Sequence, residues 1–164
     1  MTTRRTLFGV LSGAALAAFA GTSAMAQEVT LKLEHFLPPQ ANVPVKVLDV
    51  WADRVEADSD GRIKVERYAA MALGGAPPEL YDLVNDGAID IGWTVVGYTP
   101  GRFPTTEVFE LPFMVEDARA ASYAYWKMYE THMQEEFAGV KMIGTWVHGP
   151  GMFHTMDPVE TPAD

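Results

Sequence analysis

The 164-residue sequence has no cysteine, few basic residues and no long apolar run after Ala20. Without cysteine there is no disulfide, thiol nucleophile, thiolate metal ligand or lipid-bearing amino-terminal cysteine. Lys and Arg number 12 against 22 Asp and Glu, so the formal net charge is −10. Such an acidic chain repels nucleic acid and anionic membrane surfaces, although a locally positive pocket can still bind a small anion. We therefore expect no nucleic-acid partner and no membrane-embedded domain.

The first 26 residues have the pattern of a secretory signal peptide, and we assign residues 1–26 to it. Arg4 and Arg5 precede an apolar run from Leu7 to Ala20, and Ala24-Met25-Ala26 is a small-x-small cleavage site. The run is too short for a membrane span. The paired arginines loosely resemble a twin-arginine export motif, and a general secretory signal fits equally well. The sequence therefore predicts a periplasmic protein.

The remaining chain begins with the pattern of an α/β domain. Alternating apolar and polar residues predict strands from Val29 to Glu34 and from Ile63 to Tyr68, and Ile89 to Trp93 predicts a third. Pro44 and Pro77 each begin a predicted helix between two strands. Strands joined through helices run parallel, so we expect a mostly parallel sheet of βαβ units in which the second and third strands pair.

The second half of the chain is less regular. Residues 116–137 are predicted to be helical, and residues 141–146 and 152–156 are predicted to be strands on either side of a turn. One helical stripe is expected to face the core: Tyr125, Met128, Tyr129 and His132. Residues 161–164 read Thr-Pro-Ala-Asp, which is typical of a helix start, so we expect the chain to be part of a longer protein.

Six motifs, in this order and spacing, resemble the solute-binding proteins of tripartite ATP-independent periplasmic (TRAP) transporters, of the C4-dicarboxylate-binding type. They are LEHFLPP, DGRIKVERY, ALGG, LVNDGAIDIGWT, GYTPGRFP and ELPF. The resemblance implies two α/β lobes that close on an organic acid, carry out no reaction and deliver it to membrane permease subunits. By this resemblance, residues 27–140 form most of the first lobe. Residues 141–164 form hinge strands and the start of a second lobe that is largely missing.

Ligands on parallel sheets bind beyond the carboxyl ends of the strands, so residues in those loops and in the expected hinge are candidate contacts. Arg102 can grip a carboxylate through two parallel hydrogen bonds, or it can form a surface ion pair. The aromatic residues can enclose a ligand or belong to the core. The candidate ligand-binding residues are His35, Phe36, Leu73, Gly74, Trp93, Tyr98, Arg102, Trp146, His148 and Gly151. The resemblance implies that the main carboxylate-binding arginine follows Asp164, and some relatives have an arginine where Gly151 stands.

Two other functions compete with solute transport. A secreted hydrolase could use Glu107 and Glu110 as paired carboxylates, although no Gly-x-Ser-x-Gly elbow is present. A binding protein of the same fold could instead serve a sensor. The four histidines lack the spacing of zinc ligands, so we predict no zinc site. The resemblance implies a protein that carries out no reaction, so we predict no catalytic residues and no cofactor. The ligand's identity, an accompanying sodium or calcium ion and the oligomeric state stay open.

Overall fold

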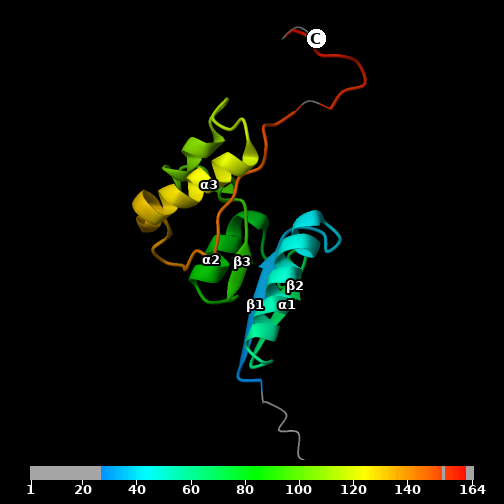
Figure 1. The fold of residues 1–164 in the computed structure, drawn as a ribbon, viewed down its shortest axis with the longest axis vertical. Coiled ribbons are helices and arrows are strands. Elements are labelled where there is room, and N and C mark those ends of the chain that lie inside the picture. The colour runs from blue at the N-terminus through cyan, green and yellow to red at the C-terminus, as the bar shows by residue number, and fades with distance from the viewer. Residues whose placement is uncertain (1–26, 153, 162–164) are drawn as a thin grey trace, which may run out of the picture.

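The computed structural model of the protein describes residues 27–152 and 154–161 (Figure 1). The predicted signal peptide, and most of the helix start predicted at residues 161–164, lie outside these described residues. Within them, no helix has both the length and the apolar character needed to cross a membrane.

A three-stranded parallel sheet organises the first half of the chain, as the sequence predicts. Its strands are β1 (Val29–His35), β2 (Ile63–Tyr68) and β3 (Ile91–Trp93), in the spatial order β2-β1-β3. The prediction that β2 pairs with β3 is wrong, because β1 lies between them and pairs with both. A crossover helix fixes the relative direction of two strands but leaves room for a third strand between them.

The third strand is shorter than predicted, but a side chain extends its hydrogen bonding. The backbone N–H of Asp90 donates to the carbonyl of Lys32 at 3.1 Å. The Asp90 carboxylate, through Oδ2, accepts from the Lys32 N–H at 2.8 Å. Asp90 therefore satisfies both backbone groups of a β1 residue just before β3 begins.

Helices cover the sheet where the two prolines predict them. A π-helical turn (Pro44–Leu48) leads into α1 (Asp49–Asp58), and a 3₁₀ turn (Pro77–Glu79) leads into α2 (Leu80–Asn85). Figure 1 shows α1 beside β1 and β2, and α2 beside β3. The buried core between α1 and the sheet consists of Leu33, Leu48, Ala52 and Val65. Val47, which follows the same helical pattern in the sequence, is exposed.

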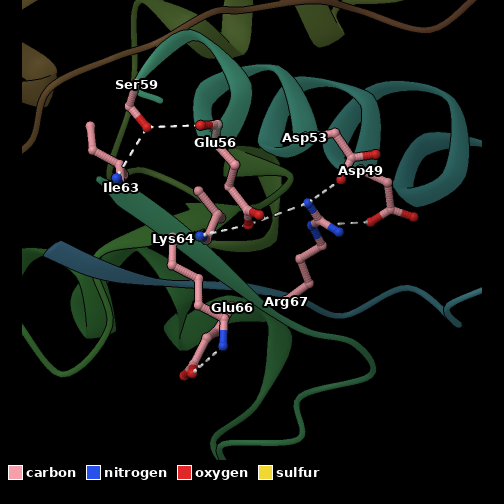
Figure 2. A network of polar contacts seen from close by, with 9 residues as sticks. Asp49, Asp53, Glu56, Ser59, Ile63, Lys64, Glu66 and Arg67 are labelled. Atoms are coloured by element: carbon pink, nitrogen blue, oxygen red, sulfur yellow. Dashed lines mark hydrogen bonds and ion pairs between the residues drawn. The ribbon is translucent and has the colours of Figure 1, made fainter. Parts of the chain in front are cut away.

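An ion-pair network joins α1 to β2 (Figure 2). The guanidinium of Arg67 lies 2.5 Å from Asp53, 3.7 Å from Glu56 and 3.8 Å from Asp49. These three acids follow one face of α1, and the Arg67 side chain is 31% exposed. Because one cation serves three partly screened carboxylates, the network contributes more than an isolated surface pair, on the order of 1 kcal/mol.

A second packed region follows β3. It contains 3₁₀ turns at Val96–Tyr98, Thr106–Glu110 and Gln134–Phe137, the helix α3 (Ala118–Met128) and a π-helical segment (Tyr129–Met133). Its buried hydrophobic side chains are Phe103, Tyr125, Met133 and Phe137. The prediction that His132 faces the core is wrong, because His132 is exposed and Met133 is buried instead. The wider π-helical turn changes which side chain faces inward.

The predicted strands at 141–146 and 152–156 do not form in the described residues, where the segment after Val140 has neither helix nor strand. It runs past α2, β3 and α3 toward the carboxyl end (Figure 1). A strand needs a partner for its backbone groups, and this segment pairs with none of β1, β2 or β3. It is attached through Val147, whose N–H donates to Ser122 Oγ on α3 at 3.0 Å.

Candidate ligand-binding site

The carboxyl ends of all three strands meet at one edge of the sheet, because the strands are parallel. His35 ends β1 and lies opposite Trp93, which ends β3. The loop after β2, residues 69–76, leads to the 3₁₀ turn before α2 and is called the strand-end loop below. This edge is where the sequence places most of its candidate contacts.

Four aromatic candidates come together here and are called the aromatic cluster: Phe36, Trp93, Tyr98 and Trp146. The Phe36 ring centroid lies 5.1 Å from that of Trp93 and 5.5 Å from that of Tyr98. Trp146 stacks on Trp93 with centroids 6.1 Å apart and an interplanar angle of 26°. These spacings are typical of favourable ring pairs. Tyr98 and Trp146 are 46% and 42% exposed, so the cluster keeps aromatic surface open to a ligand.

His35 supports the cluster from within the sheet and is only 3% exposed. Burial lowers the pKa of its imidazole more than the nearby Asp49 and Glu34 carboxylates raise it. The ring is therefore neutral near pH 7. Its Nδ1 is buried without a hydrogen-bond partner among the described residues. A neutral buried imidazole does not neutralise a ligand carboxylate, so His35 is poorly suited to be the anion-binding group.

Leu73 and Gly74 lie in the strand-end loop and are exposed. The loop backbone is unusual, because Ala70 and Met71 have φ of 53° and 58°, in the left-handed region that non-glycine residues rarely adopt. Gly74 has φ of 106°, which favours glycine. Strained backbone of this kind persists only where the surroundings hold it, and it is concentrated at functional sites.

Glu34 is a functional candidate that the sequence favours only as a strand residue, so it is not among the predicted contacts. It is fully buried, its Oε1 accepts a 2.7 Å hydrogen bond from the Leu73 N–H, and its Oε2 has no partner among the described residues. An unpaired buried polar atom costs about 1–3 kcal/mol. In the sequence Glu34 occupies a polar position of an alternating strand, which is typical of a solvent-facing residue, so no local pattern distinguishes it.

Arg102 is not available to bind a ligand carboxylate, because its guanidinium is already paired with Asp82. Its two terminal nitrogens donate to the Asp82 carboxylate at 2.6 and 2.8 Å, and its guanidinium carbon lies 4.4 Å from the Tyr81 ring centroid. These hydrogen bonds lower the pKa of the Asp82 carboxyl. Of the two roles open from the sequence, the structure shows the ion pair, which ties the loop after β3 to α2.

The remaining candidates lie on the extended carboxyl-terminal segment. His148 is exposed, and its Nδ1 lies 2.6 Å from the Gly149 carbonyl oxygen. Gly151 is exposed, and no atom lies within 4 Å of the place where a Cβ would stand. Of the three residues predicted on this segment, the structure therefore joins only Trp146 to the cluster through a ring contact.

The two acids of the hydrolase alternative, Glu107 and Glu110, lie in the 3₁₀ turn Thr106–Glu110. Glu107 accepts a hydrogen bond from the Gly101 N–H, which gives it a local structural partner. Neither Glu107 nor Glu110 is buried. Among residues 27–152 and 154–161, no group of three or more His, Cys, Asp or Glu side chains is placed to hold a metal ion.

A parallel α/β sheet whose strand ends carry an open aromatic surface is the arrangement expected of one lobe of a solute-binding protein. The comparisons with known proteins agree. The family model described as bacterial extracellular solute-binding protein, family 7, matches residues 33–164, and the chain belongs to this family. The predicted resemblance to TRAP solute-binding proteins is therefore confirmed.

Two solved structures and one curated relative show how the match is distributed. A TRAP solute-binding protein from Rhodoferax ferrireducens T118, in complex with benzoate, is 50% identical with a TM-score of 0.71. The match covers 74% of this chain and 38% of that one. A marine metagenome TRAP solute-binding protein specific for aromatic acid ligands, in complex with 3-hydroxybenzoate, is 47% identical. Its TM-score is 0.73, and the match covers 76% of this chain and 39% of that one.

The curated relative is the outer membrane transporter protein TsaT of Comamonas testosteroni. It is 30% identical over 153 residues, which are 92% of this chain and 45% of the relative. The chain therefore spans less than half the length of each protein compared here.

Proposed function

We propose that this chain forms one wall of an extracytoplasmic binding site for a small aromatic carboxylate, in a protein that delivers its ligand to a TRAP permease. The aromatic cluster at the carboxyl edge of the sheet carries this proposal. Ligand pockets are mostly apolar walls with a few placed polar groups, and offset or tilted ring contacts favour a planar aromatic ligand over an aliphatic one of equal size. The benzoate and 3-hydroxybenzoate complexes of the two solved relatives support the same ligand class.

The described residues supply aromatic surface for the ring of the ligand, but their two candidate cationic groups do not neutralise its carboxylate. Arg102 is occupied by Asp82, and His35 is buried and neutral. The carboxylate therefore points away from the strand ends toward a cation on another segment, in agreement with the arginine that the family resemblance implies after Asp164. Ligand held between this wall and a second one biases the equilibrium between open and closed states. No bond is made or broken, and the protein acts in the periplasm as a binding subunit.

The first test is a thermal-shift and calorimetric comparison on the full-length gene product without its signal peptide. Benzoate and 3-hydroxybenzoate are compared with cyclohexanecarboxylate, which has similar size without an aromatic ring, and with succinate, a C4 dicarboxylate. A ligand bound only by the native state stabilises it by about 2.7 kcal/mol at 100 times its Kd. We expect stabilisation by the aromatic acids and little by the other two.

A variant pair connects binding to the aromatic cluster. Trp93→Leu removes the ring that contacts both Phe36 and Trp146, and we expect its Kd for benzoate to rise by about tenfold or more. Tyr123→Leu is the control, because Tyr123 is an aromatic residue on α3 that is 67% exposed. Equal affinities for benzoate and cyclohexanecarboxylate, or a folded protein that responds to no acid, would contradict the proposal.

A further inference from the structure

Three hydrogen bonds fasten the strand-end loop to the carboxyl end of β1. The N–H groups of Ala70 and Met71 donate to the carbonyls of Leu37 and His35, both at 3.1 Å. The third bond runs from the Leu73 N–H to the buried Glu34 carboxylate at 2.7 Å. The acceptors of the first two bonds are the carbonyls of the residues directly before and after Phe36. The loop therefore holds the backbone that places one ring of the aromatic cluster.

The first two bonds are backbone to backbone, and their donors belong to the two residues with left-handed φ. That conformation is unfavourable for alanine and methionine, so the loop needs an additional constraint to keep it. Glu34 supplies the only side-chain acceptor among these three bonds. A carboxylate oxygen is a strong hydrogen-bond acceptor, and Glu34 lies on β1, which ends directly before Phe36.

The second carboxylate oxygen of Glu34 indicates that stability alone does not account for this residue. Oε2 is buried with no partner among the described residues. Opposite Glu34 on β3 stands Gly92, which offers no side chain to pair with it. An apolar side chain of similar length would fill the same space without this desolvation cost. Glu34 therefore lowers the stability of the fold through its unpaired oxygen, and in return it holds the strand-end loop through its bond to Leu73.

We infer that Glu34 is a positioning residue of the ligand site, which holds the strand-end loop, and through it the backbone around Phe36, in the ligand-binding arrangement. The inference rests on the proposed function and adds a residue that the ligand does not need to touch. Its signature is a loss of affinity that accompanies local loosening at Leu73 without general unfolding of the sheet.

The test compares three substitutions of Glu34 in the full-length gene product. Glu34→Gln keeps an oxygen acceptor for the Leu73 N–H. Glu34→Met keeps the length and loses the acceptor, and Glu34→Asp keeps the carboxyl group but withdraws its oxygens by one methylene. Glu79→Gln and Glu79→Met are the matched controls, because Glu79 also accepts from a loop N–H, that of Ala76, at 2.7 Å, but is exposed.

Hydrogen exchange of the Leu73 amide and the Kd for benzoate are measured together. We expect Glu34→Met and Glu34→Asp to speed Leu73 exchange while the β1 and β2 amides stay protected, and to raise the Kd by about tenfold or more. Glu34→Gln should stay within about threefold of the wild type, as should both Glu79 variants. If Glu34→Met does not fold, Glu34→Asp carries the same comparison.

Three results would overturn the inference: faster Leu73 exchange with unchanged affinity, equal losses of affinity in Glu34→Gln and in Glu34→Met or Glu34→Asp, or loss of protection across the whole sheet in both Glu34→Met and Glu34→Asp. Failure of the proposed function looks different. In that case the wild-type protein binds no aromatic carboxylate, while exchange at Leu73 in the ligand-free protein still shows whether Glu34 holds the loop.

Discussion

Gly92 offers a stringent test of how α2 is seated on the sheet. A Cβ at this position would stand 2.8 Å from Val84 Cγ2 and 3.5 Å from the Leu80 carbonyl oxygen. Carbon atoms in favourable contact lie about 3.5–4.0 Å apart, so the methyl of Gly92→Ala enters space that α2 already fills. Val84 is β-branched within a helix and strongly prefers one rotamer, which limits its escape. Either α2 shifts or Val84 leaves that rotamer.

Overpacking of this kind costs about 1–3 kcal/mol, and we expect Gly92→Ala to lower the free energy of unfolding by that amount. The assay is urea denaturation of the full-length gene product with linear extrapolation. Gly144→Ala is the matched control, since no atom lies within 4 Å of a Cβ there. Its expected change is between zero and a gain of about 1 kcal/mol, because alanine restricts the unfolded chain.

A double-mutant cycle identifies the clash as the cause. Val84→Ala removes the methyl that a Cβ at Gly92 would meet, so the double variant should recover at least about 1 kcal/mol relative to the sum of the two single changes. Gly92→Ala as stable as Gly144→Ala, or a coupling energy near zero, would refute the packing argument and with it the seating of α2.

Two further predictions concern charge. Arg67→Met should destabilise the protein by about 1 kcal/mol at low salt and by less at high salt. Arg54→Met is the control and should have no measurable effect, because Arg54 belongs to an i,i+4 pair whose side chains are 80% and 76% exposed. Equal effects of the two substitutions in urea denaturation would contradict the stabilising role of the network. Because burial lowers the pKa of His35, the contribution of this residue to folding stability is complete above the ordinary histidine pKa of about 6.5 and declines as the pH falls below that value. His35→Gln should therefore lose less Tm than wild type between about pH 7.5 and about pH 5.5, and parallel Tm profiles would contradict this.

Strand and helix positions in the first half of the chain follow from the sequence because local patterns specify them. Alternation marks β1 and β2, and Pro44 and Pro77 mark the helical turns that lead into α1 and α2. The order of the strands in the sheet does not follow from the sequence, because it depends on which edge of the β1–β2 pair accepts β3 and no local pattern specifies that edge. The strands predicted after Val140 failed for a related reason, since alternation alone does not supply a pairing partner.

The candidate site divides in the same way. Strand-end positions led to Phe36, Trp93 and Tyr98, which the fold brings together. The sequence favours Glu34 only as a strand residue, because its burial results from a loop that returns 39 residues later, and no local pattern reports such a contact. From the sequence, Arg102 can bind a ligand carboxylate or form a surface ion pair, and only the three-dimensional position of Asp82 decides between these roles.

The central position of β1 also has a consequence for the order of folding. Its pairing with β2 closes across one helix, whereas its pairing with β3 waits for a longer stretch of chain. A chain growing from its amino end can therefore complete β1, α1 and β2 first. During that interval one edge of β1 presents unpaired N–H and carbonyl groups, the kind of edge that pairs with other chains and aggregates. The Asp90 side chain closes part of this edge at Lys32 as soon as β3 arrives.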